Sequence, residues 1–151
     1  MSSIDWNKGE TGRSFQVWKD LSFAKVIAQV QFVGEDIQIL LWGGEKPHIG
    51  CTVLSVPRPS MEEKERGSCT SSVINVTGHK DEALCRAISE EVCRQTLRTV
   101  VCTGGFHIDG ITGEQICRVQ EAAEELKNQI LEKIHNTDRK KEKKGMPCTN
   151  H

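Results

Sequence analysis

Three short glycine-containing segments each carry one histidine, and they hold the residue types best suited to ligand binding or catalysis. They are residues 43–50, 77–81 and 104–113, and they contain His48, His79 and His107. An imidazole can donate or accept hydrogen bonds, hold a metal ion or move a proton near neutral pH. Glycine lets the backbone approach a ligand closely. The composition of these segments therefore predicts ligand-binding turns.

Two of the segments come directly before stretches with helical periodicity, and this position favours an anion. The first N–H groups of a helix lack partners within the helix, and the helix dipole is positive there. Gly78 and Lys80 add an amide and a cationic side chain before one helix, and Thr112 and Gly113 precede the other. Phosphate is the natural guest at such positions.

Aromatic residues adjoin both glycine pairs, and Trp42 and Phe106 could offer flat apolar surface to a ring system. Each signal alone is also typical of an ordinary turn, because neither glycine pair completes a P-loop or a Gly-x-Gly-x-x-Gly motif. The coincidence of three histidine-bearing turns in one small chain indicates that they share one edge of a sheet.

Alternating and helical patterns predict the elements that position these turns. Strands are expected at residues 23–32, 37–42, 49–56, 71–76 and 99–103, and helices at about 81–97 and from 113 to 134. Thr112 and Gln115 form a capping-box signature at the start of the last helix. The expected fold is α+β: an antiparallel meander of four strands followed by helix, strand and helix, with both helices packed on one face of a single sheet.

The 151 residues are enough for one domain. Residues 1–22 form a weakly patterned N-terminal segment, residues 23–135 a single α/β domain, and residues 136–151 a basic tail that we expect to be disordered. The net charge of −1 argues against nucleic acid and anionic lipid as partners. The apolar stretches are shorter than a membrane span, and the N-terminus lacks a secretory signal.

The cysteines point to a reducing cytoplasm. Their number, seven, is odd, and no two are closely spaced, which argues against a disulfide framework. Five lie within apolar patterns and are expected to be small core residues: Cys51, Cys85, Cys93, Cys102 and Cys117. Cys69 and Cys148 lie in polar stretches and are expected to be exposed.

The same turns resemble those of the LpdD-like family, the small accessory subunits associated with UbiD-type decarboxylases such as gallate decarboxylase. The resemblance rests on residues 43–50, 78–81 and 105–109 and covers roughly Phe23 to Leu131. Members of that family are regarded as prenylated-flavin chaperones. The resemblance implies a non-catalytic carrier that takes reduced prenylated FMN, or FMN, made by a UbiX-type flavin prenyltransferase and delivers it to a UbiD-type decarboxylase.

Carried over residue by residue, the resemblance implies a cofactor-binding set of Gly43, Gly44, His48, Gly50, Gly78, His79, Lys80, Gly105, His107 and Asp109. Lys80 and the Gly78 amide suit a phosphate, and His48 and His107 can donate to flavin carbonyls. We also expect a homodimer, because an exposed sheet face or edge in so small a domain needs cover.

Two other functions fit the same residues. A metal-dependent hydrolase or other metalloprotein would use His48, His79, His107 and Asp109, with Asp81 as a further ligand. A structural assembly factor would use the sheet as an interaction surface and the turns only for stability. The sequence has no Gly-x-Ser-x-Gly nucleophile elbow and no paired catalytic carboxylates at a recognisable spacing.

Overall fold

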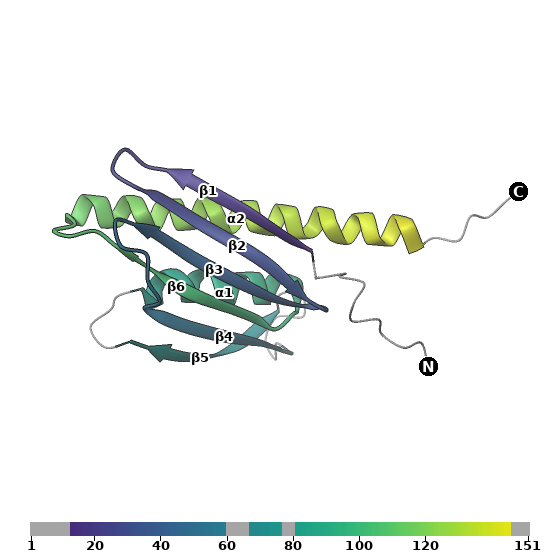
Figure 1. Cartoon of the computed structure of the whole chain (residues 1–151). Coiled ribbons are helices and arrows are strands. Elements are labelled where there is room, and N and C mark those ends of the chain that lie inside the picture. The colour runs from purple at the N-terminus through teal and green to yellow at the C-terminus, as the bar shows by residue number, and fades with distance from the viewer. Residues whose placement is uncertain (1–12, 60–66, 77–80, 146–151) are drawn as a thin grey trace, which may run out of the picture.

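A six-stranded sheet with two helices on one of its faces makes up the described part of the chain (Figure 1). The structure is a computed structural model that describes residues 13–59, 67–76 and 81–145. Its elements are β1 (Ser14–Asp20), β2 (Lys25–Val33), β3 (Asp36–Gly44), β4 (Cys51–Arg58), β5 (Ser68–Asn75), α1 (Glu82–Thr96), β6 (Val100–His107) and α2 (Gly113–Gly145). The predicted α+β class and the placement of both helices on one face are confirmed.

The strand order is β1-β2-β3-β6-β4-β5, with β3 and β6 parallel and the other pairs antiparallel. The four-strand meander is wrong in detail, because β6 lies inside the sheet and separates β3 from β4. α1 returns the chain across the helix face, and β6 then fits against β3 closely. A Cβ atom at Gly104 would lie 1.6 Å from the carbonyl oxygen of Leu41.

The core lies between the sheet and the helices. α1 packs on β4, β5 and β6, whereas α2 packs on β1 and β2. Alternate residues of the strands point into this layer, so that Val30, Ile39 and Val53 are completely buried there. Ser89 of α1 is also buried in this layer. Its hydroxyl donates a hydrogen bond of 3.2 Å to the carbonyl oxygen of Val100.

The cysteines follow this layering with one exception. Cys51, Cys85, Cys93 and Cys102 are buried in the core, as predicted. Cys117 is exposed, because it lies outside the buried stripe of α2, and the expectation of a core position was wrong. Cys69, expected to be exposed, is half-buried.

Two elements extend beyond their expected limits. β1 lies inside the segment that showed only weak patterning. α2 continues to Gly145 through residues 136–145, where the sequence favoured disorder. Asp138 accepts a hydrogen bond from Arg98 at 2.8 Å, and Lys141 lies 3.7 Å from Glu35, so contacts with the body hold the basic end of the helix.

The start of α2 carries the predicted capping box. The backbone N–H of Gln115 donates to the Thr112 hydroxyl at 3.1 Å, and the backbone N–H of Thr112 donates to the side-chain oxygen Oε1 of Gln115 at 2.9 Å. Although α2 has 33 residues, its buried residues form one stripe. None of the helices in the described ranges is both long and apolar enough to cross a membrane.

Candidate functional site

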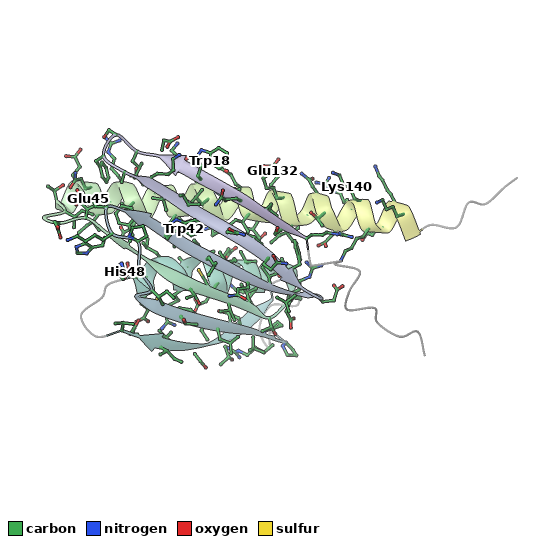
Figure 2. All side chains as sticks on the ribbon, viewed as in Figure 1. Trp18, Trp42, Glu45, His48, Glu132 and Lys140 are labelled. Carbon is green, nitrogen blue, oxygen red and sulfur yellow. The ribbon has the colours of Figure 1, made fainter. Side chains whose placement is uncertain are left out.

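The parallel pairing of β3 and β6 places the ends of both strands at one edge of the sheet. Gly44 pairs with His107 there, and β4 begins beside them, where Cys51 pairs with Gly104. Figure 2 shows His48 at this end of the sheet, together with Glu45. The ring centroids of His48 and His107 are 6.1 Å apart. Two of the three histidine turns therefore converge.

Of the third turn, residues 77–81, only the last residue lies within the described part of the chain. Gly78, His79 and Lys80 lie outside the described residues, whereas Asp81, which ends this turn, lies within them. Asp81 comes directly before α1 and joins the other two turns.

A buried carboxylate holds His48 in place. Oδ2 of Asp81 lies 3.1 Å from Nε2 of His48, and Oδ1 accepts a hydrogen bond of 2.9 Å from the backbone N–H of Phe106. Asp81 occupies the N-cap position of α1, but its side chain makes no capping hydrogen bond. Its carboxylate therefore ties the start of α1 to β6 and to the histidine turn.

The ring of His48 faces acceptors on both sides. Nδ1 lies 3.1 Å from the carbonyl oxygen of Lys46, and Nε2 faces the Asp81 carboxylate. Each ring nitrogen therefore has a hydrogen-bonding partner, and these two contacts fix the orientation of the half-buried ring.

A second, exposed cluster lies beside the first. Asp109 accepts hydrogen bonds of 2.8 Å from Nζ of Lys46 and 2.8 Å from Nε2 of His107. The hydrogen bond from Lys46, followed by that from His107, holds the pKa of the Asp109 carboxyl below its ordinary value. The same contact with Asp109 raises the pKa of Lys46. This cluster therefore combines two donors with one ionised carboxylate.

The four described glycines of the predicted set make room for protein atoms. A Cβ atom at Gly105 would lie 2.8 Å from Nε2 of His48, and one at Gly50 would lie 2.0 Å from Oδ2 of Asp81. One at Gly43 would lie 2.9 Å from the Phe106 ring, and Gly44, at φ +80°, would meet the His107 backbone at 2.2 Å. The glycines thus allow the side chains of the site to assemble.

A pocket of about 580 Å³ opens beside these clusters, between the first turns of α1 and α2 and the end of β6. Its lining is mainly apolar: Ala83, Leu84, Phe106, Ile108, Ile111, Ile116 and Val119, with Asp81, His107 and Gln120 as the polar members. Trp42 pairs with Gly105, so by strand alternation it lies on the opposite sheet face from Phe106. The two aromatic residues cannot stack on one ring together.

The metal-binding alternative finds no set of ligands in the described ranges. Within residues 13–59, 67–76 and 81–145, no group of three or more histidine, cysteine, aspartate or glutamate side chains is arranged to hold a metal ion. His79, the remaining member of the proposed metal set, lies outside those ranges.

The described geometry suits a ligand that is apolar over much of its surface and carries polar or anionic groups. Lys46, His48 and His107 supply donors, and the adjoining pocket has the volume typical of small-molecule and cofactor sites. Two members of this site, Lys46 and Asp81, were absent from the predicted cofactor-binding set, although Asp81 was named as a further ligand in the metal alternative. Lys46 lies inside the first glycine segment, a signal that could have identified it, whereas an aspartate before a helix indicates only a cap.

Three comparisons place the chain among known proteins. A domain described as the prenylated flavin chaperone LpdD-like domain matches residues 22–135. Protein LpdD of Lactiplantibacillus plantarum is 27% identical over 108 residues, which are 69% of this chain and 73% of that protein. A chain in the crystal structure of a novel chaperone complex for yeast 20S proteasome assembly superposes with a TM-score of 0.44 at 13% identity, over 85% of this chain and 95% of that one.

Proposed function

Because this chain belongs to the prenylated flavin chaperone LpdD-like family, we propose that it binds reduced prenylated FMN and delivers it to a UbiD-type decarboxylase. Family membership indicates a chaperone that serves a partner protein. The flavin is cargo in this proposal, and the chain itself catalyses no reaction. A UbiX-type flavin prenyltransferase is the proposed source of the cargo, and the cytoplasm is the proposed compartment.

One observation supports the flavin site above all. The turns of β3 and β6 bring His48 and His107 together, with ring centroids 6.1 Å apart, beside a pocket of cofactor size. Lys46, His48 and His107 would donate to flavin carbonyl or phosphate oxygens, while Asp81 and Asp109 hold these donors in position. Apolar pocket walls would shield the reduced ring from water and oxygen.

The sheet face away from the helices supports a homodimer as part of the proposal. Trp18, Ile27 and Trp42 pair across β1, β2 and β3, which places them in one row on this face. Figure 2 labels Trp18 and Trp42 on the sheet. Trp18 is 53% exposed, and Leu40 and Leu54 are also exposed on the same side of the sheet. Covering such an exposed apolar face with a second surface removes it from water and stabilises the complex. Sedimentation equilibrium of the wild type and of Trp18→Gln tests this part, since the variant is expected to dissociate more readily.

The flavin proposal is tested by anaerobic titration with reduced prenylated FMN, followed by native mass spectrometry. The wild type is expected to retain one flavin per chain and to pass it to an apo decarboxylase, whose activity then appears. His48→Ala and His107→Ala are expected to lose retention at least tenfold while remaining folded by circular dichroism. His135→Ala, a change at an exposed histidine of α2, is the matched control.

Normal retention by both His48→Ala and His107→Ala would contradict the proposed site. Retention that persists without any transfer to the apo decarboxylase would contradict the delivery role. Metal analysis of the purified protein distinguishes the metalloprotein alternative, which requires a stoichiometric ion that is lost in the same variants.

A further inference from the structure

We propose that the apolar pocket between α1, α2 and β6 receives the isoprenoid-derived part of the cargo, so that the chain prefers prenylated FMN to FMN. This inference rests on the proposed function and assigns a task to a separate part of the site. The polar clusters recognise features that both flavins share, whereas the pocket recognises the hydrocarbon that only one of them carries.

The pocket lining supports a hydrocarbon guest. Seven of its residues are apolar, and three come from the first two turns of α2 or the loop before it: Ile111, Ile116 and Val119. Ile116 is 39% exposed, whereas the other large aliphatic residues of α2 are buried in the core. An apolar ligand in the pocket would remove this surface from water.

The position of the pocket also fits a ligand that spans two environments. Asp81 and His107 line the pocket and at the same time belong to the polar clusters with His48 and Asp109. A ring system held by the donors of these clusters would therefore be in contact with the apolar wall. Phe106 connects the two parts, because its backbone N–H binds Asp81 and its ring lines the pocket.

The size of the preference follows from the hydrophobic effect. Each methylene removed from water improves affinity by about fourfold. A prenyl group adds five carbon atoms, so burial of only two of them gives a preference of about tenfold or more. A pocket that held only the features common to both flavins would give none.

The experiment compares dissociation constants of reduced prenylated FMN and reduced FMN, measured anaerobically by fluorescence titration. Ile116→Gln removes apolar wall, and Ala83→Phe fills space from an exposed position at the start of α1, where a larger side chain does not disturb the core. Ile74→Gln is the matched control, since Ile74 is 75% exposed on β5 and does not line the pocket. Circular dichroism verifies that each variant is folded.

The wild type is expected to bind prenylated FMN at least tenfold more tightly than FMN. Ile116→Gln and Ala83→Phe should each weaken the binding of prenylated FMN at least fivefold and change the affinity for FMN less than twofold. Ile74→Gln should change neither affinity. Equal wild-type affinity for the two flavins, or equal losses for both in the pocket variants, overturns the pocket assignment and leaves the proposed function intact. Failure of the wild type to bind either flavin overturns the proposed function itself.

Discussion

Gly105 lies directly against the imidazole of His48. A Cβ atom at position 105 would be 2.8 Å from Nε2 of His48 and 2.8 Å from its carbonyl oxygen. These are distances that real Cβ atoms do not adopt, so a side chain at 105 and the observed His48 ring exclude each other. His48 can thus occupy its observed position only because residue 105 of β6 has no side chain.

Gly105→Ala is therefore expected to displace His48 and to destabilise the fold by about 1–3 kcal/mol, the usual cost of overpacking. Urea denaturation measures the stability, and under the proposed function flavin titration should show a loss as large as that of His48→Ala. Gly113→Ala is the control, because a Cβ atom there meets nothing within 4 Å. An alanine at 105 with wild-type stability and binding would show that the His48 ring has another position available.

Asp81→Ala is expected to lower the free energy of unfolding by about 1–3 kcal/mol, because it leaves the part-buried N–H of Phe106 without its acceptor. Asp81→Asn keeps an oxygen for this N–H and should cost less, although it removes the charge opposite His48. Chemical denaturation of both variants tests this order. Asp20→Ala, at an aspartate with a 69% exposed side chain, should change stability by less than about 0.5 kcal/mol. Equal stability of the wild type and Asp81→Ala would refute the anchoring role of this carboxylate.

The Lys46–Asp109 contact should persist from neutral pH into the mildly acidic range. The pKa of Asp109 is lowered, first by the hydrogen bond from Lys46 and then by that from His107. A carboxyl with a lowered folded-state pKa adds stability above its ordinary value, near 4, and loses it as the pH falls through the lowered value. The contact is therefore expected to break only below about pH 4.

Carbon-detected NMR titration of the Asp109 carboxyl measures this behaviour directly. Lys46→Met should move the midpoint upward, toward the ordinary range of an aspartate. Lys25→Met is the control, since Lys25 lies 3.5 Å from Asp20 and not beside this cluster. The same midpoint in Lys46→Met and in the wild type would mean that Lys46 does not stabilise the ionised carboxylate.

The cysteines should differ sharply in their reactivity toward iodoacetamide at pH 8. Burial raises the pKa of the Cys93 thiol to about 11, and burial also raises the pKa of Cys51. Cys117 is exposed, so it is expected to react at least about 100-fold faster than the buried thiols. Mass spectrometry of tryptic peptides gives the order, and labelling in concentrated urea, where all seven cysteines should react, is the control. Rapid labelling of Cys51 in the native protein would contradict the described core.

The sequence was most informative where function depends on local signals. Glycine and histidine at strand ends predicted the meeting of His48 and His107, because strand ends at one sheet edge lie close together. The capping residues Thr112 and Gln115 were also identified, since a capping box is set by residues three positions apart.

The features missed from the sequence depend on contacts between distant segments. Lys46 and Asp109 are 63 residues apart, and only the parallel register of β3 and β6 brings them within 2.8 Å. Asp81 was named only as a further ligand of the metal alternative, because the Phe106 amide that it binds lies in a distant strand that was expected to end at residue 103. The basic end of α2 was expected to be disordered because its contact with Glu35 is equally remote.

The central position of β6 also constrains when a newly made chain can assemble the candidate site. In the described part of the chain, β1–β3 and β4–β5 have no strand pairing with each other except through β6. When a nascent polypeptide has not yet left the ribosome as far as His107, β1–β3 and β4–β5 form two separate pieces. The backbone groups along the edges of these pieces that later bind β6 then lack hydrogen-bonding partners. His48 then has neither Gly105 beside it nor Phe106 to fix Asp81, so the candidate site can assemble only after the last strand has been synthesised.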